Sequence, residues 1–257
     1  MIRLFLPAAV FFLSSFLFSS MQSCGDPGPT KPRLNGGKPE LILWAWERPE
    51  DLRFLDRSKF GVAFLEQTLN SNGTEVIHIP RRQPLKVESN TYLIAVTRIE
   101  IQRGSRIAEA DEDRIIRKIV SRIVKSEAVK GVRGVQIDFD AVESERNFYR
   151  KIIDEVRQNL KKDTSLSITA LASWCAGDLW LKDLPIDEAI PMLFDMGKDD
   201  QRIRNLLNSG VDWNETLCKA SYGLSVNQPS DFPLAPERSR YYFNSRPWRE
   251  SDLKKIN

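Results

Sequence analysis

The sequence is poor in histidine and cysteine, the side chains on which many catalytic and metal sites depend. Its 257 residues include one histidine, His78, and three cysteines. A single histidine argues against His-based catalytic triads and His-rich zinc sites. His78 itself stands in a short β-branched run, where an ordinary strand residue is expected. No glycine-rich phosphate loop follows the early strand-like runs, which disfavours an open nucleotide-binding sheet. The formal net charge of +3 is too small to indicate nucleic acid as a partner.

Residues 1–23 have the pattern of a secretory signal peptide. Arg3 gives a positive start, and residues 4–18 form an apolar run that only one proline and two serines interrupt. Small residues follow the run, as they do in signal peptides. The run is too short for a comfortable membrane span. We therefore expect residues 1–23 to direct export.

The next residues resemble a bacterial lipobox, in which a cysteine thiol is acylated and becomes the new N-terminus. Residues 21–25 read Met-Gln-Ser-Cys-Gly, and the small Ser23 before Cys24 fits that pattern. Residues 24–39 hold four prolines and four glycines, a composition typical of a linker that cannot bury enough apolar surface to fold. We expect a lipoprotein of the bacterial cell envelope, attached to the membrane through Cys24 on the periplasmic or surface side. The alternative is cleavage near Ser23 and a free periplasmic or secreted protein.

Residues 40–257 alternate strand-like and helix-like runs without a second linker, which indicates one domain. Strand-like runs occupy residues 41–46, 61–69, 75–79, 92–101, 132–140, 166–174, 189–196, 220–226 and 241–244, and helical patterns occupy 111–125, 143–160 and 200–207. This alternation predicts an α/β fold, and a (β/α)8 TIM-type barrel fits the length. Little helical pattern separates the second to fourth strand-like runs, so we expect an irregular or incomplete barrel. Within it, Cys175 and Cys218 are a candidate disulfide pair if the protein is exported.

One strand-like run ends in two carboxylates. Residues 134–140 read Gly-Val-Gln-Ile-Asp-Phe-Asp, and strand alternation places Gln136, Asp138 and Asp140 on one face. Burying carboxylates in a sheet is costly unless a partner neutralises them or a reaction uses them, so the run predicts a site.

Other candidates stand at the ends of further strands, where parallel barrels carry their chemistry. The substrate-binding candidates there are Trp46, Trp174, Asp195 and Trp248. Carboxylates act as acids and bases on glycosidic bonds, and indoles cover the apolar faces of sugar rings. The combination therefore indicates a sugar site, with Asp138 and Asp140 as its catalytic pair and Gln136 as a further substrate-binding candidate.

Four contiguous runs resemble the bacterial proteins grouped as domain of unknown function 3142. They cover residues 134–140, 148–149, 166–175 and 184–197, and the resemblance extends from about Glu40 to the C-terminus. It implies a glycosidase-type (β/α)8 barrel and no established reaction.

The chain is more distantly similar to the family 18 glycoside hydrolases, the chitinase-like enzymes. Their fourth strand ends in Asp-x-Asp-x-Glu, which aligns with residues 136–140, and their sixth ends in Met-x-Tyr-Asp, which aligns with residues 192–195. Trp248 falls where those enzymes often have a tryptophan on the floor of the sugar site.

This resemblance also implies roles for individual side chains. Asp140 corresponds to the acid that protonates the leaving oxygen, and Asp138 to the residue that orients the acetamido group of the substrate. Asp195 corresponds to a partner for a sugar hydroxyl or for a charge. The sequence departs from the pattern because Gln136 replaces the first aspartate, Phe194 lacks the tyrosine hydroxyl, and Asp140 is one methylene shorter than glutamate.

Two functions follow as hypotheses. The first is an exported glycosidase-like barrel that acts on a polysaccharide or peptidoglycan-type glycan through Asp140 and Asp138. The second is a catalytically inactive barrel that binds glycans or an envelope protein, which Gln136 and Phe194 favour. The structural alternative for the two aspartates is an ion-pair network with Arg98 or Arg246. A third reading of Asp-Phe-Asp, as a Mg²⁺ or Mn²⁺ pair, rests on a short and common pattern. We expect neither a metal nor a cofactor.

Overall fold

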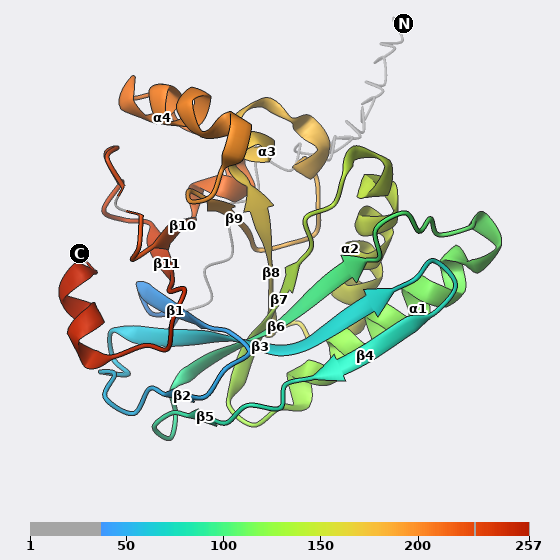
Figure 1. Ribbon diagram of the computed structural model, residues 1–257, viewed down its shortest axis with the longest axis horizontal. Coiled ribbons are helices and arrows are strands. Elements are labelled where there is room, and N and C mark those ends of the chain that lie inside the picture. The colour runs from blue at the N-terminus through green and yellow to red at the C-terminus, as the bar shows by residue number, and fades with distance from the viewer. Residues whose placement is uncertain (1–36, 229, 257) are drawn as a thin grey trace, which may run out of the picture. The chain divides into compact units, whose positions relative to one another are not determined.

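The computed structural model describes residues 37–228 and 230–256. The predicted signal peptide, Cys24 and most of the predicted linker lie outside these residues. The described part is built on a closed barrel of eight parallel strands (Figure 1). In order around the barrel they are β1 (Leu41–Ala45), β3 (Phe60–Ser71), β6 (Tyr92–Ile101), β7 (Val132–Asp138), β8 (Ser165–Leu171), β9 (Glu188–Met192), β10 (Ser221–Ser225) and β11 (Ser239–Phe243), and β11 pairs with β1. The predicted TIM-type barrel is confirmed.

The helices cover only part of this barrel. One α-helix follows each of the strands β6 to β9, namely α1 (Glu109–Lys125), α2 (Arg146–Asn159), α3 (Ala172–Gly177) and α4 (Asp200–Asn208). Figure 1 shows α1 and α2 side by side on the outside of the barrel. Among the described residues, no α-helix separates β1 from β3, β3 from β6, or β10 from β11, so the expected irregularity is confirmed. None of the helices in this part of the chain is long and apolar enough to cross a bilayer.

The sequence of α1 explains why it forms and how it packs. Its buried residues recur at the spacing of one helical face: Ile115, Ile116, Ile119, Val120 and Ile123. Acidic side chains occupy its first turn and basic side chains its last, an arrangement that complements the helix dipole. The helix therefore buries one apolar stripe against the strands.

Strand alternation divides the core into two parts. On β6, Ile94 and Val96 point into the barrel and join a cluster with Trp44 and Tyr241. Ala95, between them, belongs to the larger core under the helices. The inward-facing side chains of the strands therefore fill the barrel interior, and those nearest the strand ends reach its mouth.

A buried ion pair occupies the N-terminal end of the barrel. Lys38 Nζ lies 2.5 Å from Glu188 Oε1, and the Tyr241 hydroxyl donates to the same oxygen at 2.7 Å. The ammonium group also lies 5.0 Å from the centre of the Tyr241 ring. Lys38, in the range predicted as linker, thus packs into the base of the barrel.

One wall of the barrel continues past its C-terminal end. The first half of β3 pairs with β1, and the second half pairs with the antiparallel strand β4 (Val76–Pro80). The register between β3 and β6 shifts between Leu65 and Gln67, as in a β-bulge. Two further short strands, β2 (Glu50–Asp51) and β5 (Leu85–Lys86), pair only with each other.

The strand expected over residues 166–174 ends early, at Leu171, and α3 begins at Ala172. Two contacts outside the barrel account for the difference. Cys175 forms a disulfide with Cys218 at a Cα–Cα distance of 5.8 Å, and Trp174 meets Trp180 edge-on with ring centres 4.8 Å apart. Both contacts hold the segment in the outer core, so the candidate cysteines are joined and Trp174 does not stand at a strand end.

Candidate active site

A cavity of about 910 Å³ opens at the C-terminal mouth of the barrel, the end at which parallel barrels carry their active sites. We call it the central cavity. Five of the residues singled out from the sequence line it: Trp46, Gln136, Asp138, Asp140 and Asp195. Trp174 and Trp248 are not part of its lining.

Asp138 is held from both sides. It is 5% exposed, and its Oδ2 atom lies 2.9 Å from Nη1 of Arg98 on the neighbouring strand β6. Its Oδ1 atom accepts a hydrogen bond of 2.7 Å from the hydroxyl of Thr169 on β8. Arg98 is therefore the partner of Asp138, whereas Arg246 pairs with Asp252.

Asp140 differs from Asp138 in its exposure and in its bonding partners. It lies beyond the end of β7 and is exposed. Among the described residues, no group hydrogen-bonds to its carboxylate or forms an ion pair with it. Desolvation at the cavity wall and the negative charge of Asp138 raise the pKa of Asp140, and the charge of Arg98 opposes this rise. A raised pKa keeps a carboxylic acid protonated to higher pH, as a general acid requires.

Gln136 forms the floor of the cavity with Trp44. Its side chain is fully buried. The amide oxygen accepts a hydrogen bond of 2.8 Å from the indole Nε1 of Trp44, and the amide nitrogen donates to the Ser167 hydroxyl at 3.2 Å. Gln136 thus fixes a neutral, aromatic floor where the family 18 pattern has an aspartate.

The rings of Trp46, Phe194 and Phe243 form one wall of the cavity, and the Trp44 ring of the floor adjoins them. The rings of Phe194 and Phe243 stack with their centres 5.4 Å apart, Trp44 meets Phe194 edge-on at 6.5 Å, and Trp46 meets Phe243 edge-on at 6.2 Å. The guanidinium of Arg98 lies 5.7 Å from the Trp46 ring. The cavity therefore has an apolar wall beside charged groups.

Asp195 lies at the rim, in the turn after β9. Its backbone has a positive φ of 51°. Gln228 stabilises this turn because its Oε1 atom accepts from the Asp195 backbone N–H at 3.1 Å and its Nε2 atom donates to the Asp195 carboxylate. The side chain is exposed and available to a ligand at the rim.

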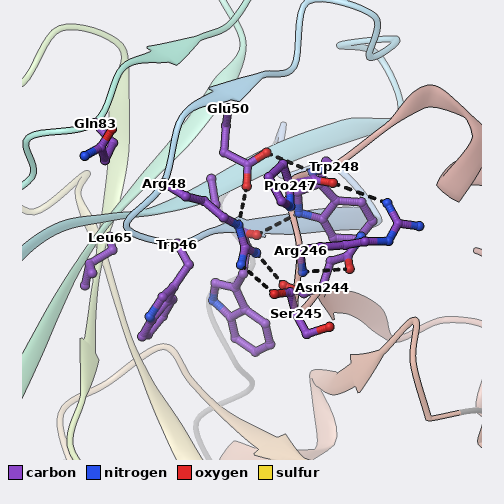
Figure 2. Close-up of polar contacts among 12 residues, drawn as sticks. Trp46, Arg48, Glu50, Leu65, Gln83, Asn244, Ser245, Arg246, Pro247 and Trp248 are labelled. Atoms are coloured by element: carbon purple, nitrogen blue, oxygen red, sulfur yellow. Dashed lines mark hydrogen bonds and ion pairs between the residues drawn. The ribbon is translucent and has the colours of Figure 1, made fainter.

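Trp248 lies behind Trp44 rather than in the cavity. Its indole Nε1 donates to the backbone oxygen of Trp44 at 2.8 Å, and its backbone N–H donates to Glu50 at 2.9 Å. Figure 2 shows Arg48 beside this contact, paired with Glu50 at 2.8 Å and donating to the backbone oxygen of Ser245 at 3.0 Å. Trp248 thus fixes the strand that carries Trp44.

Thr169, Trp44 and Phe243 also line the cavity, although the sequence analysis did not select them as site residues. For two of them, strand alternation predicts that the side chain faces into the barrel. Thr169 lies two residues after the inward-facing Ser167, and Trp44 lies two residues before Trp46. Among the described residues, no group of three or more Asp, Glu, His or Cys side chains could hold a metal ion.

Comparisons with known proteins give two similar solved structures and one family model. The spore cortex-lytic enzyme SleL of Bacillus cereus is 13% identical, with a TM-score of 0.45, and the match covers 74% of this chain and 52% of that one. The chitinase domain of the spore coat protein CotE from Clostridium difficile is 11% identical, with a TM-score of 0.37 and coverages of 66% and 54%. The chain spans about half the length of these solved structures. A search of curated proteins finds no match. Residues 90–184, which include Asp138 and Asp140, match the family described as Domain of unknown function (DUF3142), and the predicted resemblance is confirmed over that segment.

Proposed function

We propose that this protein hydrolyses a polysaccharide or peptidoglycan-type glycan, with Asp140 as the general acid. One observation carries the proposal: an accessible carboxyl group with a raised pKa and no bonding partner among the described residues lies beside an aromatic wall. A carboxyl group that served only structure would be paired, as Asp138 is.

The two aspartates have separate roles in this proposal. Asp140 donates its proton to the glycosidic oxygen as the bond to the anomeric carbon breaks. The acetamido oxygen of the substrate attacks that carbon, as in the substrate-assisted route, and Asp138 orients the acetamido group. Water then opens the intermediate and returns a proton to Asp140. Because Arg98 and Thr169 fix both oxygens of Asp138, this group is suited to orienting a substrate rather than to transferring a proton.

Binding to a glycan array, measured together with product release, tests this function. We expect the wild type to bind and cleave, and Asp140→Asn to bind without cleaving, since the amide keeps the shape and loses the acid. Asp113→Asn removes an exposed carboxylate from the outer helix α1 and serves as the matched control, with cleavage unchanged. Cleavage that survives Asp140→Asn would exclude Asp140 as the acid.

A specific observation supports a second function, a barrel that binds glycans or an envelope protein without catalysis. Gln136 is neutral and committed to Trp44 and Ser167, and Asp140 is one methylene shorter than the glutamate of the family 18 pattern. A displacement of about 1 Å at an acid can cost around a hundredfold in rate. Binding without product, equal in the wild type and in Asp140→Asn, is the result that this second function requires.

We also propose that the protein is exported and anchored in the cell envelope through an acylated Cys24. The sequence of residues 1–39 supports this location, and the disulfide between Cys175 and Cys218 supports an oxidising compartment. Incorporation of radiolabelled palmitate into the wild type and not into Cys24→Ser is the expected result. Equal labelling of both proteins would exclude Cys24 as the acylated residue.

A further inference from the structure

Two rings of the aromatic wall stand on a side of the barrel that has no α-helix to brace it. Trp46 directly follows β1, and Phe243 is the last residue of β11. Among the described residues, no α-helix lies between β1 and β3 or after β11. The segments that carry these two rings are therefore held by contacts of another kind.

The pairing between β1 and β11 stops short of both rings. It ends at Leu43 and Tyr242, whereas the rings of Trp46 and Phe243 meet edge-on with their centres 6.2 Å apart. The hydrogen bonds of this ladder consequently do not set the distance between the two residues that carry the rings. Side-chain contacts at the mouth join the end of β1 to the end of β11 instead.

Arg81 binds the end of β1. It directly follows β4 and is half-buried. Its Nη1 atom donates to the backbone oxygens of Trp46 at 2.6 Å, Ala45 at 3.3 Å and Leu65 at 3.3 Å. Leu65 lies where β3 exchanges β1 for β4 as its neighbour, and backbone oxygens at such a point need donors from outside the ladder. Arg81 supplies them.

The same guanidinium group holds the turn that follows Trp46. Its Nη2 atom donates to the backbone oxygen of Arg48 at 2.7 Å, and its Nε atom donates to that of Gln83 at 2.9 Å. In the described part of the chain, Arg81 forms no ion pair with a carboxylate, so all of these acceptors are backbone oxygens. A guanidinium group spreads its donors over a planar fork, whereas an ammonium group has them on one atom. Arginine therefore fits this set of oxygens and lysine does not.

Arg48 extends the connection to the segment after β11 (Figure 2). Its Nη1 atom donates to the backbone oxygen of Ser245 at 3.0 Å, and its Nη2 atom donates to that of Asn244. Its Nε atom donates to the buried carboxylate of Glu50 at 2.8 Å, which fixes the guanidinium group. Through Arg48, Arg81 is thus connected to the chain immediately beyond β11.

We propose that Arg81 and Arg48 are positioning residues that hold Trp46 and Phe243 at the wall of the central cavity, in place of α-helices. Neither arginine lines that cavity, so both act through the backbone segments that they bind. The inference rests on the proposed function only for its effect on binding, because the position of the Trp46 ring can be measured without a ligand.

Fluorine NMR of protein labelled with 5-fluorotryptophan tests the positioning role on the full chain. The Trp46 signal is assigned by its loss in Trp46→Phe. We expect Arg81→Ala and Arg81→Lys each to shift and broaden this signal, because the ring then samples more than one position. The signals of Trp174 and Trp180, in the outer core, keep their wild-type positions and report an intact fold. Arg117→Ala, which removes an exposed arginine from α1, is the matched control and leaves every signal unchanged.

A second variant tests the connection to β11 without removing a charge. Arg48→Lys keeps a positive group beside the buried Glu50 and removes the fork that reaches the segment after β11. We expect this variant to perturb the Trp46 signal as well, since the Trp46 ring packs on Phe243.

Calorimetry with a hexamer of N-acetylglucosamine measures the effect on binding. Arg81→Ala should lower the affinity about tenfold, the equivalent of about 1.4 kcal/mol. Because the arginine acts through the ring, Arg81→Ala combined with Trp46→Ala should bind no more weakly than Trp46→Ala alone. Arg117→Ala should leave the affinity unchanged.

The possible contrary results are distinguishable. A wild-type Trp46 signal in both Arg81→Ala and Arg48→Lys excludes the positioning role. A wild-type signal in Arg81→Lys shows that a positive charge suffices and excludes the role of the planar fork. Affinity losses that add in the double variant show that Arg81 acts independently of Trp46. A wild-type protein that binds no member of a glycan array excludes the proposed function, and the fluorine spectra then decide the positioning role by themselves.

Discussion

Arg98 holds Asp138 at 2.9 Å across the pairing of β6 and β7, and Asp140, two residues further on, has no such partner among the described residues. The strand thus presents one neutralised carboxylate and one free carboxyl group on the same side of the barrel mouth. This asymmetry gives the two aspartates different expected responses to substitution.

Replacing Arg98 by glutamine leaves Asp138 buried with only the hydroxyl of Thr169 as a partner. We expect the free energy of unfolding to fall by about 3 kcal/mol, because an uncompensated buried charge is strongly destabilising. Asp138→Asn in the same background removes that charge and restores most of the loss. Urea unfolding monitored by circular dichroism measures both changes. Arg53→Gln, which breaks an exposed ion pair with Asp51, is the comparison variant and leaves stability nearly unchanged. An Arg98→Gln protein as stable as this variant would contradict the expectation.

Asp138→Asn also lowers the pKa of Asp140. Desolvation and the negative charge of Asp138 raise that pKa in the wild type, and the substitution removes the second cause. A general acid is active while it is protonated. In the variant, the decrease in hydrolysis rate on the alkaline side of the pH–rate profile therefore occurs at lower pH. Carbon-detected NMR titration of the Asp140 carboxyl group, assigned by its loss in Asp140→Asn, measures the same shift without turnover. A limb that moves to higher pH would show that another group is the acid.

The barrel and the pair Asp138 and Asp140 could be predicted from the sequence because they depend on local pattern. Alternation of Val135 and Ile137 with Gln136 and Asp138 indicates a strand and its two faces before any pairing is known, although the observed strand ends at Asp138, two residues earlier than expected. The choice of Arg98 over Arg246 as the partner of Asp138 depends on which strand lies next to β7. That adjacency is a property of the closed sheet, and no local pattern encodes it.

Trp174 shows where local pattern fails. Its run reads as a strand up to residue 174, yet the strand ends at Leu171. The disulfide to Cys218, 43 residues away, and the packing of Trp174 on Trp180 decide the boundary. Contacts between distant segments override the intrinsic preference of a short run, so an aromatic expected at the mouth lies in the outer core.

The ion pair at the base of the barrel predicts a stability that depends on pH. Burial alone would raise the pKa of Glu188, but the charge of Lys38 and the hydrogen bonds from Lys38 and Tyr241 outweigh burial and lower it. The stabilisation is therefore present above the unfolded pKa of the carboxyl group and is lost as pH falls through the lowered folded pKa. Lys38→Met should cost about 3–5 kcal/mol at neutral pH and progressively less in acid. Glu188→Gln added to Lys38→Met should recover much of the loss. Urea midpoints measured across the acid range test this, and a cost that stays constant with pH would exclude the pair as its source.

The disulfide should contribute about 3–4 kcal/mol, because it closes a loop between residues 43 apart in sequence. Both cysteines are fully buried, so Cys175→Ala with Cys218→Ala removes the bond with little change in packing volume. We expect the double variant to unfold at lower urea concentration than the oxidised wild type. Dithiothreitol should lower the midpoint of the wild type and leave that of the double variant unchanged. Equal midpoints for the wild type with and without reductant would contradict this prediction.

Substitutions of Trp46 and Trp174 distinguish an effect on ligand binding from an effect on stability. Trp46 lines the central cavity, whereas Trp174 packs in the outer core. Trp46→Ala removes a half-buried ring from the aromatic wall and should weaken oligosaccharide binding about tenfold, since stacking on a ring of this size supplies roughly 1–2 kcal/mol. Trp174→Ala leaves a void beside Trp180 and should lower the free energy of unfolding by about 3–5 kcal/mol, with unchanged affinity in the fraction that remains folded. Calorimetric binding and urea unfolding of both variants give the two readouts. If Trp174→Ala weakened binding and Trp46→Ala did not, the sugar would not lie against the rings of Trp46, Phe194 and Phe243. The central cavity would then be excluded as the binding site.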